Sequence, residues 1–319
     1  MQVYETEVLY LPDNASLRYL PEGPIQQDGS KFSWVAIQDG PEAKQGSLNL
    51  FDLSSNENCT WALDGRPGFA FPTKDPKVMV VGVERHIQLL DLSSGETQDI
   101  SAEVDADVTG TIINDGVAFP EGIIFGTKDL QFQERKAGLY FWRLADRQLI
   151  RLRDDQICSN GKVVSRNGDS WNLWDIDSPT QTVVHYEFDS RSAVLSEPTV
   201  VVDLQAEELF PDGMVATPDG QSVIVALYNP NDAPYGETRQ YGLQSGQLEA
   251  VWKTAAAAQV TCPLLLQSED RVRLVLTTAA ENMSAEKLER QPNAGALFIG
   301  ETPFGQVSED VRLDLSLDR

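Results

Sequence analysis

The sequence is short of the residues on which several large classes of protein depend. It has 3 cysteines, Cys59, Cys158 and Cys262, which lie far apart and form no CxxC pair. An odd, scattered set predicts neither a disulfide framework nor a cysteine zinc site, and it fits a reducing compartment. The chain also has only 2 histidines, His86 and His185. A serine–histidine triad or a paired-histidine mechanism is therefore disfavoured.

Long apolar runs and basic residues are scarce too. No run of about 18 apolar residues occurs, so no membrane-spanning helix is predicted. Residues 1–14, MQVYETEVLYLPDN, have no basic cluster before their apolar stretch. We therefore expect no signal peptide there, and a cytoplasmic protein. The net charge of −24, from 49 acidic and 25 basic residues, repels nucleic acid and anionic membranes. No protein partner is indicated.

Helical periodicity is weak and is confined mainly to residues 145–156 and 287–291. What recurs instead is a short β-rich run, a polar turn and a second run, as in VMVVGV (78–83) followed by HIQLLDLSSGE (86–96). Six copies of this unit can be marked at the hydrophobic residue before the turn: Leu53, Leu92, Leu144, Phe188, Leu243 and Ile299. The marks recur about every 40 to 55 residues, which is the length of a propeller blade with loop insertions.

The repeat predicts an all-β protein, a six-bladed β-propeller in which residues 1–319 form one domain with a central channel. Radial repetition explains how so many short strands avoid long exposed edges. The N-terminal run EVLYL (7–11) is expected to pair with the last blade and close the ring.

Four units begin with a polar residue followed by glycine in apolar surroundings. They are LPEGPI (20–25), INDGVAF (113–119), CSNGKVV (158–164) and FPDGMVA (210–216). Taken alone, each tripeptide is typical of a turn. Their shared position favours another interpretation, because the innermost strand of each blade starts near the channel. Glycine lets the backbone turn sharply there and leaves room for a ligand.

The tripeptide Pro-Asp-Gly occurs twice, and the two copies differ in position. Asp219 lies between two β-rich runs and is predicted to shape a hairpin turn. Asp212 lies at the start of a unit and is predicted to face the channel, together with Glu22 and Asn160 from two other units. Two carboxylates and an amide carbonyl suit a hard divalent cation such as Ca²⁺ or Mg²⁺.

These entries, in this order, resemble the gluconolactonase / regucalcin (senescence marker protein) / luciferin-regenerating enzyme family. The resemblance runs from about residue 18 to 302 and rests on LPEGP with FSWVAI, INDGVAFPEGIIFGT, CSNGKVVSRNGDSWNLWDID, FPDGMVATPDGQSVIVALYN and ENMSAEKLERQPNAGALF. It implies a six-bladed propeller that holds one divalent metal ion, Ca²⁺ first, with Zn²⁺, Mn²⁺ or Mg²⁺ as alternatives. It also implies a small-molecule substrate and, in many members, hydrolysis of lactones.

By this resemblance, Glu22, Asn160 and Asp212 are the metal ligands, and Asp212 is also the general base. A bound cation polarises the ester carbonyl, and Asp212 takes a proton from the attacking water. The prediction is a metal-dependent hydrolase of a lactone or related ester. Two alternatives stay open: a phosphotriester-type hydrolase at the same site, and a non-catalytic calcium-binding propeller.

Three further residues are expected at the substrate. Asn114 would contact the metal through water or hold the substrate, and Glu134 is the nearest match to a glutamate that touches substrate hydroxyls in some members. Ile112 stands where sugar-lactone hydrolases of the family often carry arginine. An apolar side chain there predicts a substrate less polar than gluconolactone.

Overall fold

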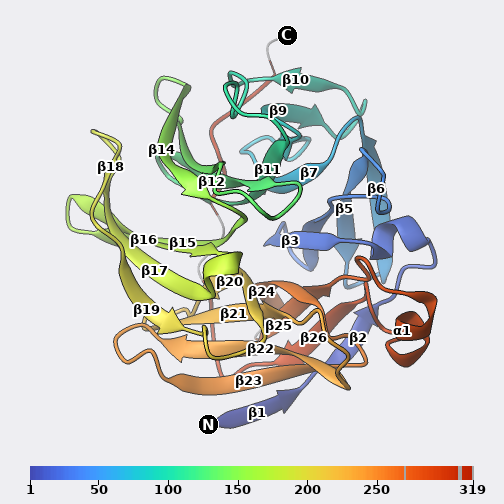
Figure 1. Ribbon diagram of the computed structural model, residues 1–319. Helices are drawn as coiled ribbons and strands as arrows, with labels where there is room; N and C mark the ends of the chain where they lie inside the picture. Colours follow the sequence, from blue (N-terminus) through green and yellow to red (C-terminus); the bar gives the residue numbers. More distant parts are fainter. Residues whose placement is uncertain (269–270, 308–310, 318–319) are drawn as a thin grey trace.

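The computed structural model describes residues 1–268, 271–307 and 311–317. Their strands form six sheets that stand around a common axis as the blades of a propeller (Figure 1), as the sequence repeat predicts. The innermost strands of neighbouring blades contact one another all the way around the ring. The start of each innermost strand is therefore brought towards the same central space.

The first three blades are each built from four strands that follow one another in chain order from the axis outwards. Their bounds are β3 (Pro21–Gln26), β4 (Lys31–Ala36), β5 (Gly46–Asp52) and β6 (Glu57–Leu63); β7 (Pro67–Pro72), β8 (Val78–Val83), β9 (His86–Asp91) and β10 (Thr97–Asp99); β11 (Thr111–Phe119), β12 (Gly122–Asp129), β13 (Ala137–Arg143) and β14 (Gln148–Gln156).

The last three blades follow the same plan, except that the fourth and fifth blades have a fifth strand and the sixth takes its fourth strand from the N-terminal segment. Their bounds are β15 (Ser159–Asn167), β16 (Ser170–Asp177), β17 (Thr182–Asp189), β18 (Val194–Leu195) and β19 (Thr199–Asp203); β20 (Phe210–Ala216), β21 (Ser222–Tyr228), β22 (Tyr235–Gly242), β23 (Leu248–Ala255) and β1 (Gln2–Glu5); β24 (Val260–Ser268), β25 (Arg271–Thr278), β26 (Leu297–Glu301) and β2 (Glu7–Tyr10).

The ring is closed by the N-terminal segment. β2 pairs antiparallel with β26 of the last blade, which confirms the expectation for residues 7–11. β1 adds parallel to β23, the outer strand of the neighbouring blade. The N-terminal chain therefore joins the two blades that come last in the sequence (Figure 1).

One predicted helical stretch is wrong and one is confirmed. Residues 148–156, within the stretch 145–156, form β14, the outer strand of the third blade, because its backbone completes the ladder of β13. Tertiary pairing here overrides a weak local preference. Residues 287–290 belong to α1 (Ala285–Arg290), whose N-cap Ser284 accepts a hydrogen bond from the Lys287 amide. Two 3₁₀ turns, η1 (Ala15–Arg18) and η2 (Ser178–Thr180), complete the structure. No helix of the described residues is long and apolar enough to cross a membrane.

All six innermost strands carry a register irregularity near their start. Such bulges bend a strand and re-aim its side chains. At some of these points a glycine is required because the neighbouring blade comes close. A Cβ on Gly161 would lie 2.6 Å from the carbonyl oxygen of Asp212, and one on Gly213 would lie 2.7 Å from the Cα of Cys262. The polar–glycine pattern therefore marks the tightest part of the ring.

The core lies between the blades, where facing sheets bury aromatic and aliphatic side chains. Trp34, Trp142 and Trp252 are fully buried there. Near the C-terminus, Leu313 and Leu315 join the cluster between the second and third blades. This packing makes the ring a rigid frame for side chains that point into the channel.

Candidate functional site in the central channel

Four polar side chains from four blades line one pocket of about 540 Å³. They are Glu22 on β3, Asn114 on β11, Asn160 on β15 and Asp212 on β20. All four are buried, with 4–7% of each residue exposed. Each stands at or beside the bulge of its strand, so the same local distortion turns all four towards the axis. The structure thus brings together three residues predicted as metal ligands and one predicted at the substrate.

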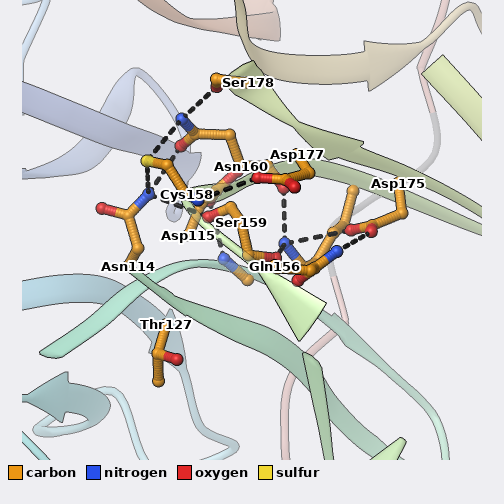
Figure 2. Close-up of polar contacts among 12 residues, drawn as sticks. Asn114, Asp115, Thr127, Gln156, Cys158, Ser159, Asn160, Asp175, Asp177 and Ser178 are labelled. Carbon is orange, nitrogen blue, oxygen red and sulfur yellow. Dashed lines mark hydrogen bonds and ion pairs between the residues drawn. The ribbon is translucent and has the colours of Figure 1, made fainter. Parts of the chain in front are cut away.

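The two amides are oriented by a chain of hydrogen bonds (Figure 2). Asn114 Nδ2 donates to Asn160 Oδ1 at 2.7 Å and to the Ser159 carbonyl at 2.9 Å. Asn160 Nδ2 donates to Ser178 Oγ at 2.7 Å, and this hydroxyl donates to the Pro211 carbonyl at 2.6 Å. Because both donor groups are used in this way, the amide planes are fixed, and the Asn160 side-chain oxygen keeps one lone pair beside the bond that it accepts from Asn114.

A second layer of buried charges holds the backbone beneath Asn160. The ammonium of Lys162 donates to the backbone carbonyl of Asn160 and to Ser159 Oγ, and it lies 3.4 Å from Asp175 Oδ1. The other Asp175 oxygen accepts from Gln156 (Figure 2). These contacts hold the backbone of Ser159 and Asn160 in place.

Two acidic residues of the pocket, Glu22 and Asp212, are buried close to other negative charges. Burial raises the pKa of Glu22 well above its usual range, and the negative charges of Asp212 and Asp115 raise it further. Burial also raises the pKa of Asp212, again with a contribution from Asp115. Two buried carboxylates near each other disfavour ionisation of both. A cation between them would relieve that penalty.

The donor set fits a hard divalent cation. Asp212 Oδ1 is buried and accepts no hydrogen bond from any described residue, and such an atom is costly unless something else satisfies it. Within the described ranges, no group of three or more histidine, cysteine, aspartate and glutamate side chains could hold a metal ion. Any metal ion in this pocket would therefore need the side-chain carbonyl of Asn160 in addition to the carboxylates of Glu22 and Asp212. Oxygen-only coordination of that kind is typical of Ca²⁺ and Mg²⁺.

The pocket wall contains residues that sequence reasoning missed. They are Lys128 at the end of β12, Phe132 in the following loop, Tyr228 at the end of β21, and Gln259 and Glu281 from the last blade. The Tyr228 hydroxyl donates to Glu281 Oε2 at 3.2 Å. The sequence offers a weak signal for Lys128 alone: it is a cation that follows the run GIIFGT (122–127) in a strongly acidic chain.

Two residues expected to contact the substrate, Ile112 and Glu134, do not belong to the described lining of this pocket. Ile112 is 2% exposed and is packed within the third blade. Glu134 lies in the loop after β12 with 72% of its side chain exposed, 3.2 Å from the Lys136 ammonium. Asp219 shapes the turn between β20 and β21, where its Oδ1 accepts from Thr217 Oγ1 at 2.6 Å and from the Gln221 amide at 3.0 Å. The two Pro-Asp-Gly copies thus have different structural positions.

Comparison with known proteins gives the family. The profile described as the SMP-30/Gluconolactonase/LRE-like region matches residues 20–280, which include all four blade-entry residues. The chain belongs to the SMP-30/gluconolactonase/LRE-like family.

Relatives of this family member include two bacterial lactonases. The chain is 28% identical over 193 residues to the putative sugar lactone lactonase YvrE of Bacillus subtilis, across 60% of this chain and 62% of that protein. It is 28% identical over 289 residues to the L-arabinolactonase of Azospirillum brasilense, across 89% and 88% of the two chains. Among solved structures, the calcium-binding protein regucalcin of Agrobacterium tumefaciens matches with a TM-score of 0.80 at 20% identity, over 98% of this chain and 100% of that chain. This last match concerns the fold.

Proposed function

We propose that this SMP-30/gluconolactonase/LRE-like protein is a divalent-metal-dependent hydrolase of lactones or related esters. The observation that carries the proposal is the convergence of Glu22, Asn160 and Asp212 from three blades on one pocket, with Asp212 Oδ1 buried and unsatisfied. The two lactonases among the relatives support the reaction class.

In this proposal Glu22, Asn160 and Asp212 hold the cation, with Ca²⁺ favoured by the all-oxygen donor set. When bound, such a cation supplies a Lewis acid for the ester carbonyl. Asp212 accepts a proton from the attacking water. Asn114 holds the Asn160 side-chain oxygen in place through its 2.7 Å hydrogen bond.

The test uses protein stripped of metal with a chelator and then dialysed. Ca²⁺, Mg²⁺, Mn²⁺ and Zn²⁺ are added back singly, and acid release from a panel of aldonolactones is followed with a pH indicator. We expect activity to return with at least one metal. Measurable metal binding without hydrolysis of any lactone would instead indicate a non-catalytic calcium-binding propeller.

Asp212→Asn tests the role of the base, with Asp219→Asn as the matched control from the second Pro-Asp-Gly. Loss of a positioned base lowers turnover by about 10²- to 10⁴-fold. We expect that loss for Asp212→Asn at saturating metal and near-normal turnover for Asp219→Asn. Equal turnover in the two variants would remove Asp212 from the mechanism.

A further inference from the structure

Lys128 is a buried cation in the wall of the candidate site. It is 6% exposed, and it lines the same pocket as Glu22, Asn160 and Asp212. Its backbone is held there by a bridge to Cys158 at the entry of the next blade. The position of the side chain is therefore set by the frame of the propeller rather than by a mobile loop.

The ammonium of Lys128 has no direct anionic partner in the described part of the chain. It takes part in no hydrogen bond and no ion pair there, and its Nζ lies 6.0 Å from the centre of the Phe132 ring. The second lysine of the pocket differs in this respect. Lys287 Nζ donates to the Pro230 carbonyl at 2.7 Å and to Gln259 Oε1 at 3.3 Å. The charge of Lys128 acts on the carboxylates of Glu22 and Asp212 only through space, without a hydrogen bond or ion pair. A buried ammonium without a direct contact is costly unless an anion reaches it.

Once a divalent cation is bound, the positive charge of Lys128 has no balancing negative charge in the pocket lining. The cation balances the carboxylates of Glu22 and Asp212. Glu281 and Lys287, which also line the pocket, carry opposite charges. No carboxylate of the pocket lining then remains to balance Lys128.

The strand register relates this cation to the residue at position 112. Ile112 on β11 is paired directly with Lys128 on β12. The apolar residue at position 112 is packed within the blade, and its cross-strand neighbour brings the positive charge into the pocket. The expectation of a less polar substrate, drawn from Ile112 alone, did not include this neighbour.

The geometry points to Lys128 as a specificity-determining residue that binds a carboxylate substituent of the substrate, so that the preferred substrate class is lactones bearing a free carboxylate. This inference rests on the proposed function for the reaction. The ester group would face Glu22, Asn160 and Asp212, while the carboxylate of the same molecule would pair with Lys128 on the wall of the pocket.

The kinetic test compares two lactones that differ at one carbon. D-glucaro-1,4-lactone carries a carboxylate where D-glucono-1,4-lactone carries a hydroxymethyl group. We expect the metal-loaded wild-type protein to have a kcat/KM at least about tenfold higher for the carboxylate-bearing lactone, since a charge-assisted contact in a buried site is being made. A wild-type preference for the neutral lactone would overturn the inference without any variant.

Lys128→Met then separates binding from folding effects. We expect its KM for D-glucaro-1,4-lactone to rise about tenfold or more, with kcat and the kinetics of the neutral lactone changed less than about threefold. Lys128→Arg should keep part of the preference, because it keeps the charge. Lys77→Met removes the same charge at an exposed position outside the pocket and should change neither substrate. Equal losses on both lactones in Lys128→Met, with no recovery in Lys128→Arg, would show a merely structural role.

A binding measurement keeps this inference distinct from the proposed function. Isothermal titration with D-glucarate and D-gluconate is performed on the calcium-loaded wild type, Lys128→Met and Lys128→Arg. Tighter binding of glucarate that is lost in Lys128→Met and retained in Lys128→Arg supports Lys128 even if neither lactone is hydrolysed, an outcome in which only the proposed reaction fails. Hydrolysis of both lactones with no dependence on Lys128 in either assay leaves the reaction standing and refutes the carboxylate contact.

Discussion

Replacing Asp212 by asparagine should stabilise the metal-free protein and destabilise the calcium-loaded protein relative to wild type. In the absence of a cation, Asp212 is a buried carboxylate with an unsatisfied oxygen and a pKa raised by burial and by Asp115. An unsatisfied buried polar group costs on the order of 1–3 kcal/mol, and more when it is charged. Asparagine keeps the shape and removes the charge.

The expected shift in melting temperature follows from the size of the chain. Unfolding entropy of about 2.1 cal/mol/K per residue means that 1 kcal/mol moves the melting temperature of a protein this size by roughly 1.5 °C. Asp212→Asn should therefore melt about 2–4 °C above wild type in a chelator. Calcium at about 100 times its dissociation constant should stabilise wild type by about 2.7 kcal/mol, or roughly 4 °C. The variant, having lost a ligand, should gain much less.

The sign of the pH dependence provides an internal check. An acid whose pKa is higher in the folded than in the unfolded state binds more protons when folded, so stability falls as pH rises through the raised pKa. In chelator, the increase in melting temperature of Asp212→Asn over wild type should be absent at acid pH, below the ordinary carboxyl pKa. It should grow as the pH rises towards neutral.

The assay is thermal unfolding by calorimetry in chelator and across a calcium titration, with Asp219→Asn as the control. Asp219 accepts two hydrogen bonds within its turn, and its pKa is lowered by them. Its replacement should lower the melting temperature slightly in both conditions and leave the calcium response unchanged. A melting temperature of Asp212→Asn below wild type in chelator, or an undiminished calcium response, would refute the reasoning.

Two further predictions concern the same site. Calcium affinity, measured by isothermal titration, should weaken as pH falls from 8 to 5, because protons compete for Glu22 and Asp212, whose pKa values are both raised. An affinity that does not change over this range would show that these carboxylates are not ligands. Lys162→Met should lower the free energy of unfolding by about 3–5 kcal/mol in urea, because it leaves Asp175 as a buried charge without its ion pair. The double variant Lys162→Met with Asp175→Asn should recover part of that loss, and a loss below about 1 kcal/mol in the single variant would contradict the assigned network.

The sequence by itself determined the blade repeat and the entry positions of the channel. The hydrophobic marks of the repeat fall within two residues of the end of the third strand of every blade, at β5, β9, β13, β17, β22 and β26. These features are local, because alternating strands and turn residues encode a blade within one stretch of chain. The polar–glycine pattern was readable for the same reason: Gly161 and Gly213 lie at bulges where neighbouring blades come close.

Only the tertiary structure decided which other side chains complete the pocket. Lys128 faces it because of its register with Ile112 and its bridge to Cys158, and Ser178 reaches Asn160 from the end of the next strand. Glu134, close to Lys128 in sequence, is turned towards solvent. Such positions depend on pairing and packing between segments far apart in the chain, and a one-residue change of register reverses the direction of every side chain on a strand. No local pattern in the sequence records that choice.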